Sequence, residues 1–355
     1  MKHHIRTSLV LALTAALLSG TALSGTAWAD PAPVLAPTKD ADGKPLPFGR
    51  PAYQKPDVPL GTGPYKAIMA EDPSLPDHTL YYPADMAAAG KLPIITWGNG
   101  ACLNAGNRFR IALTEMASHG FLIVAGGPID NAKYEVGPQE NPPVTLANGN
   151  GANAPRRPPP PPQAAPKPGD AVGRNTVPQL IAGIDWAVKE NERQGSKFYH
   201  RLDTQAIGVA GQSCGGMLAT QVSADPRIKA TVLFSGVPFL DRPVIASKVD
   251  PKAQLAAIHA PVLILAGDAG HDILHQASID DLAYIKNAPV FMAWQDGLTH
   301  IGTYGMKNGG ELTRLGWEWF AWQLRHEQKY AAVFRGADCA LCKEGDGWHV
   351  ERSMK

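Results

Sequence analysis

The chain has 355 residues, of which 44% are hydrophobic and 18% are charged, and its formal net charge is +1. This composition excludes a collagen, a coiled coil and a wholly disordered chain. An almost neutral chain is not drawn to polyanions by its overall charge, so we expect no nucleic-acid partner. The length is sufficient for one large α/β domain beside shorter segments that do not join a core.

The N-terminus has the pattern of a cleavable signal peptide. Lys2 and Arg6 precede a short apolar run at 9–18, and the small-residue sequence Ala-Trp-Ala at 27–29 comes just before Asp30. The run is shorter than the ~20 apolar residues that a membrane-spanning helix needs. We therefore predict cleavage after Ala29, export to the periplasm or the medium, and a mature chain without a membrane span.

Two proline-rich segments divide the rest of the chain. The segment 30–60 is expected to be a weakly ordered arm, and 137–170, with five consecutive prolines at 158–162, a disordered surface insertion. The predicted organisation is a signal peptide at 1–29, the arm at 30–60, an α/β domain at 61–335 that carries the insertion, and a C-terminal tail at 336–355.

From Pro64 onward, short apolar runs alternate with helical patterns. Continuous apolar strands that alternate with helices indicate a mainly parallel sheet covered by helices on both faces. The short connection at 235–260 leaves no room for a large lid domain. Strands are expected at 65–69, 79–82, 92–97, 121–125, 206–210, 230–234, 261–265 and 290–294, and helices at 109–118, 176–192, 216–222, 278–285 and 310–327.

A G-x-S-x-G motif at 211–215 lies between a predicted buried strand and a predicted helix. In this context the serine stands on a tight turn, where flanking glycines are needed because the neighbouring backbone comes too close for side chains. The N-terminus of the following helix favours a developing negative charge. The motif therefore indicates Ser213 as a catalytic nucleophile.

A serine nucleophile needs a base, and His300 is the best-placed histidine. It follows the predicted strand at 290–294 in the loop Gly-Leu-Thr-His-Ile-Gly at 297–302. The carboxyl ends of parallel strands share one edge of a sheet, so this loop is expected beside Ser213. His271 is the rival, but it lies on the loop expected to supply the acid.

The acid is expected directly after the strand at 261–265, where Asp268 and Asp272 compete. We favour Asp272, because its place beyond the glycine turn points it back toward a histidine loop. Asp268, at the end of the strand, more often braces a turn. The candidate triad is therefore Ser213, Asp272 and His300.

Backbone N–H groups are expected to form the oxyanion hole. One donor is assigned to Cys214, the residue after the nucleophile, and the other to Ala101, with Cys102 as the alternative. In an exported protein disulfides persist, and Cys339 with Cys342 suggests a small structural loop. Cys102 and Cys214 then remain, and a bridge between them would pin both donor loops.

At these residues the sequence resembles the α/β-hydrolase superfamily, and specifically secreted serine esterases of the dienelactone-hydrolase-like and cutinase-like kind. The resemblance covers 64–327, and its motifs are W-G-N-G-x-C at 97–102, G-Q-S-C-G-G at 211–216 and G-A-D-C-x-L-C at 336–342. It implies an α/β-hydrolase fold and ester hydrolysis through an acyl-enzyme on Ser213, with no cofactor and no metal.

The sequence thus predicts a secreted, single-domain monomer that hydrolyses a small or polymeric carboxylic ester. A serine peptidase or amidase on the same fold is the first alternative, and a non-catalytic binding protein is the second. Hydrolysis of p-nitrophenyl esters beside peptide anilides separates these interpretations.

Overall fold

The computed structural model describes residues 59–129, 173–241, 249–343 and 347–353. The predicted signal peptide, nearly all of the predicted arm and the predicted insertion at 137–170 lie outside these residues. Within the described ranges, no helix is both long enough and apolar enough to cross a membrane.

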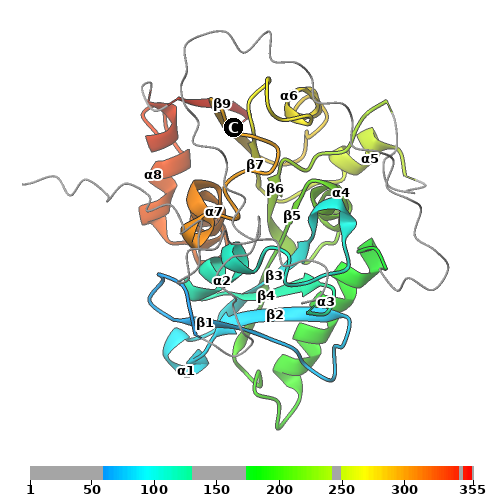
Figure 1. Ribbon diagram of the computed structural model, residues 1–355, viewed down its shortest axis with the longest axis vertical. Helices are drawn as coiled ribbons and strands as arrows, with labels where there is room; N and C mark the ends of the chain where they lie inside the picture. Colours follow the sequence, from blue (N-terminus) through cyan, green and yellow to red (C-terminus); the bar gives the residue numbers. More distant parts are fainter. Residues whose placement is uncertain (1–58, 130–172, 242–248, 344–346, 354–355) are drawn as a thin grey trace, which may run out of the picture. The chain divides into compact units, whose positions relative to one another are not determined.

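The described residues form one sheet of nine strands, in the order β1-β2-β4-β3-β5-β6-β7-β8-β9 (Figure 1). The six strands from β4 to β8 in this order pair in parallel, whereas the pairs β1–β2, β2–β4 and β8–β9 are antiparallel. The strands are β1 (Ala67–Ala70), β2 (His78–Pro83), β3 (Leu92–Gly98), β4 (Leu122–Gly126), β5 (Leu202–Gln212), β6 (Ile228–Phe234), β7 (Val262–Ala266), β8 (Val290–Gln295) and β9 (Trp348–Ser353).

Helices cover both faces of the sheet (Figure 1). Successive side chains of a strand point to opposite faces of the sheet. In β3, Ile95 packs with α2 and α7 on one face, while its neighbour Ile94 packs with α3 and α4 on the other. The helices are α1 (Met86–Ala89), α2 (Arg110–Ser118), α3 (Val177–Glu192), α4 (Cys214–Val222), α5 (Pro251–Ala256), α6 (His275–Asp281), α7 (Gly310–Arg325) and α8 (Ala331–Phe334).

The register of the parallel strands places their carboxyl ends side by side. Gly98 of β3 pairs with Gly211 of β5, and Gln212 of β5 pairs with Phe234 of β6. The loops that follow β3, β5, β6, β7 and β8 therefore emerge at the same edge. Ligands of open α/β sheets bind at this edge, so the topology alone selects the place of the site.

The expected α/β-hydrolase fold with a mainly parallel central sheet is present. In the described part of 235–260, the connection between β6 and β7 contains only the six-residue helix α5. Several elements differ from the sequence prediction. The predicted helix at 278–285 is found at 275–281, β5 is longer than predicted, and the short helices α1, α5 and α8 were not predicted. The predicted tail contributes the edge strand β9. β9 was missed because its mostly exposed residues lack an apolar run.

Candidate active site

Ser213 stands on a sharp turn between β5 and α4. Its φ and ψ are 53° and −122°, a conformation that costs energy for a residue with a Cβ. Close packing of backbone explains the flanking glycines, because a Cβ on Gly215 would lie 2.0 Å from the carbonyl oxygen of Gly98. A Cβ on Gly211 would lie 2.3 Å from the carbonyl oxygen of Gly215. The motif at 211–215 therefore adopts the strained turn that presents the Ser213 hydroxyl at the edge of the sheet.

The structure brings Ser213, His300 and Asp272 into one hydrogen-bonded line. The Ser213 Oγ lies 2.9 Å from Nε2 of His300, and Nδ1 of His300 lies 2.7 Å from Oδ1 of Asp272. With the proton on Nδ1, the imidazole donates to the carboxylate and its Nε2 is free to accept the serine proton. This is the geometry that general-base activation of a hydroxyl requires.

The Asp272 carboxylate is completely buried and is held by backbone amides. The amides of Leu274 and Gly267 donate to its two oxygens at 2.9 and 2.8 Å. Burial disfavours the charged form, but the hydrogen bonds from His300, Leu274 and Gly267 outweigh it and lower the pKa of Asp272 to about 2. The carboxylate therefore stays ionised and can stabilise a protonated His300.

Asp268, the rival acid, lies against different partners. Its carboxylate accepts hydrogen bonds from the amides of Gly270 and Gly297 and lies 2.7 Å from Nδ1 of His271. It thus braces the loop after β7 against the loop after β8. His271, the rival base, is more than half exposed and pairs with this acid. The structure places Asp272, and not Asp268, beside His300.

His300 is fixed by its main chain as well as by its ring. Its N–H donates to the carbonyl of His271 at 3.2 Å, and its carbonyl accepts from Nε2 of Gln212 at 3.0 Å. Gln212 directly precedes the nucleophile, so the base is tied to the nucleophile strand and to the acid loop at the same time. Although Gln212 stands inside the motif, sequence reasoning assigned it no role, because its position before the serine is variable in the G-x-S-x-G pattern.

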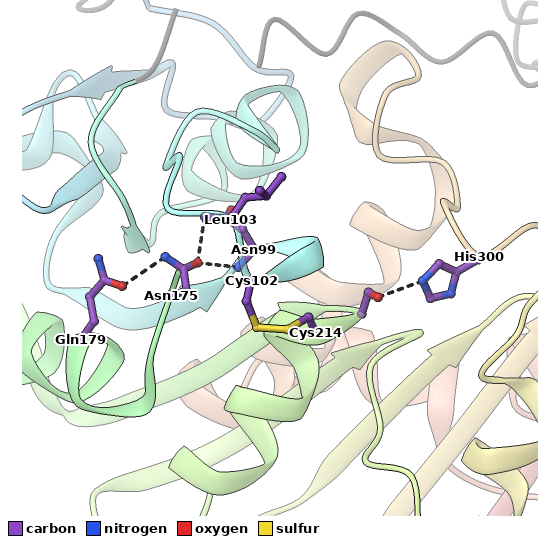
Figure 2. The surroundings of a disulfide bond; sticks show 8 residues. Asn99, Cys102, Leu103, Asn175, Gln179, Cys214 and His300 are labelled. Carbon is purple, nitrogen blue, oxygen red and sulfur yellow. Dashed lines mark hydrogen bonds between the residues drawn. A yellow bond between two sulfur atoms is a disulfide. The ribbon is translucent and has the colours of Figure 1, made fainter. Parts of the chain in front are cut away.

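The loop after β3 carries the two expected donor candidates. It forms the short 3-10 turn η1 (Gly100–Cys102), in which Ala101 and Cys102 both have positive φ, 54° and 51°. A disulfide joins Cys102 to Cys214 across a Cα–Cα distance of 5.1 Å (Figure 2). Cys214 begins α4, where the first backbone N–H groups have no acceptor inside the helix. A second bridge joins Cys339 to Cys342.

A pocket of about 190 Å³ opens at Ser213. It brings together the nucleophile, the base and the expected donor Ala101. Phe109 and Tyr304 form an aromatic wall, with ring centroids 5.5 Å apart in an edge-to-face arrangement. The pocket is lined by Ala101, Arg108, Phe109, Arg110, Ile111, Gln212, Ser213, His300, Ile301, Tyr304 and Gly305.

The fold and this site define the class of the protein, a hydrolase of the α/β-hydrolase fold. Within that class, residues 174–300 match the model of the dienelactone hydrolase family, which confirms the predicted similarity over that part of the chain. The matched segment contains Ser213, Asp272 and His300. No curated protein matches the chain.

Proposed function

We propose that the protein is a secreted serine hydrolase of carboxylic esters. The observation that carries the proposal is the line of hydrogen bonds from Ser213 through His300 to Asp272, which ends at the pocket. His300 removes the Ser213 proton as Oγ attacks the ester carbonyl carbon. The resulting tetrahedral oxyanion accepts hydrogen bonds from the N–H groups of Ala101 and Cys214.

Collapse of this intermediate breaks the bond to the alcohol, which leaves with the proton that His300 carries. Water then enters, gives a proton to His300 and attacks the acyl-enzyme, and the second collapse returns that proton to Ser213. Asp272 stays ionised throughout and stabilises the charged imidazole. No step needs a cofactor.

The pocket favours short acyl groups. Its volume of about 190 Å³ is below the ~300–1,000 Å³ of sites that enclose drug-sized ligands. The buried rings of Phe109 and Tyr304 close one side of it. We therefore expect p-nitrophenyl acetate and butyrate to be hydrolysed faster than the octanoate.

Secretion rests on the N-terminal pattern and agrees with the two disulfides, because such bonds persist in an oxidising compartment. N-terminal sequencing of the exported protein tests it. A first residue at Asp30 is the expected result, whereas retention of the run at 9–18 would contradict cleavage.

The activity test compares wild type with Ser213→Ala on p-nitrophenyl butyrate and on a peptide p-nitroanilide. We expect ester hydrolysis by wild type, a loss of about 10⁴-fold or more in Ser213→Ala, and little anilide cleavage. Ser353→Ala, at an exposed position of β9, is the matched control. Faster anilide cleavage would instead favour a peptidase or amidase, and no turnover of either substrate would favour a binding protein.

A further inference from the structure

The loop that carries the expected oxyanion donor is strained. Ala101 and Cys102 are consecutive residues with side chains, and both adopt the left-handed conformation that favours glycine. Such a conformation persists only where the surroundings hold it in place. The disulfide to Cys214 anchors the loop at its end, through the side chain of Cys102. A second support is therefore needed.

Asn175 supplies contacts at both ends of this loop, of which Figure 2 shows those with Asn99. Its backbone N–H donates to the carbonyl of Cys102 at 2.7 Å. Its side-chain oxygen accepts from the backbone N–H of Asn99 at 3.0 Å and from Nδ2 of Asn99 at 3.1 Å. Asn99 and Asn175 are almost fully buried, at 0% and 3% exposure. Of the two residues with positive φ, Ala101 lies between these contact points and Cys102 is one of them.

The orientation of the Asn175 amide is itself fixed. Its Nδ2 donates to the side-chain oxygens of Gln179 and Asn104, at 3.1 and 3.3 Å. Gln179 is held in turn by a hydrogen bond to the carbonyl of Asp77 at 2.8 Å. Backbone also fits closely around the amide, because a Cβ on Gly126 would lie 2.7 Å from Nδ2 of Asn175. These contacts fix the orientation of the amide, in which the side-chain oxygen faces Asn99 and Nδ2 faces Gln179 and Asn104.

We propose that Asn175 is a positioning residue that holds the oxyanion-hole loop in its strained conformation, and with it the N–H of Ala101. Asn175 is not among the residues that line the pocket, so it acts through Asn99 and Cys102. An oxyanion donor contributes most when it is in place before the charge develops. The residue should therefore affect kcat more than KM. The inference rests on the proposed esterase activity.

The test measures kcat and KM for p-nitrophenyl butyrate in Asn175→Ala and Asn175→Asp. Asn175→Ala removes the acceptor for Asn99, and we expect kcat to fall about 10- to 100-fold while KM stays within about twofold. Asn175→Asp keeps an acceptor for Asn99 and should recover part of kcat. Binding of an alkyl boronic acid, which forms a tetrahedral adduct on the serine, should weaken in Asn175→Ala by a factor similar to the loss in kcat.

Thr176→Ala is the matched control for effects on folding. Thr176 caps the N-terminus of α3 by accepting from the amide of Gln179 at 3.3 Å, and it makes none of the loop contacts described above. We expect this variant to lower the melting temperature without a comparable loss of kcat. If Asn175→Ala does not fold, Asn175→Asp still tests the proposal, through its kcat and its affinity for the boronic acid relative to wild type.

Wild-type kcat in Asn175→Ala, or an equal loss of kcat in Thr176→Ala, would overturn the positioning role. So would a folded Asn175→Asp whose kcat and boronic-acid affinity are both lower than those of Asn175→Ala. These outcomes differ from failure of the proposed function, in which the wild-type protein itself does not hydrolyse esters or Ser213→Ala keeps full activity.

Discussion

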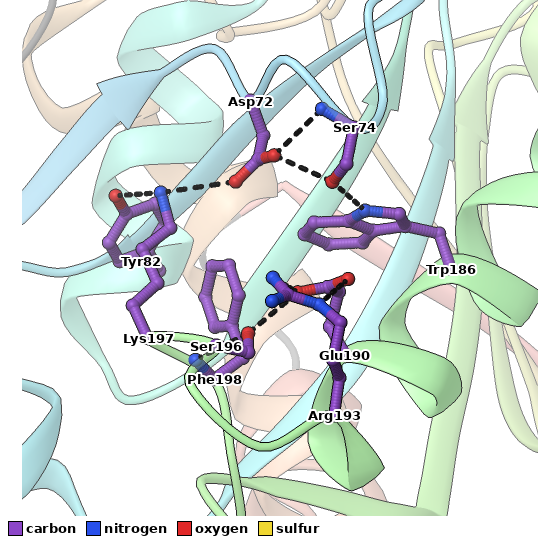
Figure 3. Close-up of polar contacts among 9 residues, drawn as sticks. All are labelled: Asp72, Ser74, Tyr82, Trp186, Glu190, Arg193, Ser196, Lys197 and Phe198. Atoms are coloured by element: carbon purple, nitrogen blue, oxygen red, sulfur yellow. Dashed lines mark hydrogen bonds and ion pairs between the residues drawn. The ribbon is translucent and has the colours of Figure 1, made fainter.

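Two clusters of hydrogen-bonded polar side chains lie at different places in this fold, and only one of them leads to a reactive group. The first surrounds the loop after β3, where Asn99 and Asn175 support the residues beside Ser213 (Figure 2). The second joins the end of α3 to the connection between β1 and β2 (Figure 3). Both contain buried carboxylate or amide groups, so polarity alone does not distinguish them.

In the second cluster, charged and polar groups pair with one another. Glu190 accepts from Nε and Nη2 of Arg193 at 2.9 and 2.6 Å and from the hydroxyl of Ser196 at 2.6 Å. These hydrogen bonds from Arg193 lower the pKa of Glu190. Nζ of Lys197 lies 3.4 Å from Oδ2 of Asp72 and also donates to the hydroxyl of Tyr82 (Figure 3). This cluster ties chain segments together.

The two regions differ in their backbone conformation and in whether their hydrogen bonds end at a group that faces a pocket. None of the nine residues shown in Figure 3 has positive φ, whereas Ala101, Cys102 and Ser213 at the site do. At the site, the line from Asp272 ends on a hydroxyl that faces a pocket. Strain next to an accessible nucleophile therefore indicates catalysis, while a closed set of pairs indicates structural support.

The largest expected effect separates the two acids after β7. Asp272→Asn should lower kcat by about 10⁴-fold, because the base then loses its ionised partner and its tautomer is no longer fixed. Asp268→Asn should instead lower the free energy of unfolding by about 1–3 kcal/mol, because it weakens a brace between two loops. Steady-state kinetics and denaturant titration of both variants check this. A greater loss of kcat in Asp268→Asn would move the acid to that residue.

The next effect concerns the disulfide beside the site. Mild reduction of Cys102–Cys214 should lower kcat about tenfold or more and raise KM less, because the two expected oxyanion donors lose their common anchor. It should also cost about 2–4 kcal/mol of stability.

The variant Cys339→Ser with Cys342→Ser is the control, since that bridge is made in the C-terminal tail. Peptide mapping of the unreduced protein must first show the bond between Cys102 and Cys214. Free thiols at both positions, or unchanged kcat after their reduction, would contradict this account of the loop.

A third prediction concerns Asp281, a fully buried acid whose carboxylate oxygens accept no hydrogen bond from the described residues. Burial, reinforced by the charge of Asp280, raises its pKa to about 8. The folded chain thus keeps a proton that the unfolded chain loses above about pH 4, so the free energy of unfolding should fall as the pH rises toward 8.

Asp281→Asn removes this dependence and should stabilise the protein by about 1–3 kcal/mol at pH 8, with little change at pH 4 and none in kcat. Denaturant titrations at both pH values measure it. Equal stabilisation at pH 4 and pH 8 would show that the carboxyl does not titrate in this way. This result would separate polar groups at the site from those elsewhere in the fold, because a strongly shifted pKa outside the site should affect stability alone.

The smallest effect on activity is expected in the second cluster. Glu190→Ala should lower the free energy of unfolding by about 1–3 kcal/mol, because the donors that surround this buried carboxylate lose their acceptor. Its kcat at 25 °C should equal that of wild type. A loss of kcat in the folded variant would mean that this cluster is coupled to the site.

The sequence was sufficient for the parallel core and for the residues that converge on the pocket. Long apolar runs identify the strands. The glycines of 211–215 identify the turn at Ser213, because backbone packs there too closely for side chains. Asn175 carried no comparable signal, because its contacts depend on how the start of α3 and the loop after β3 approach each other. Asp281 could not be recognised either, because the helix pattern does not show which carboxylate lacks a partner.

Covalent labelling with a fluorophosphonate tests the central claim most directly, because the reagent reacts with a serine that an adjacent base has activated. Intact-protein mass spectrometry and peptide mapping should show one adduct, on Ser213, in wild type. We expect no adduct in Ser213→Ala and much slower labelling in His300→Ala. Labelling at another residue, or equal rates in wild type and His300→Ala, would contradict the assignment of Ser213 as a nucleophile activated by His300.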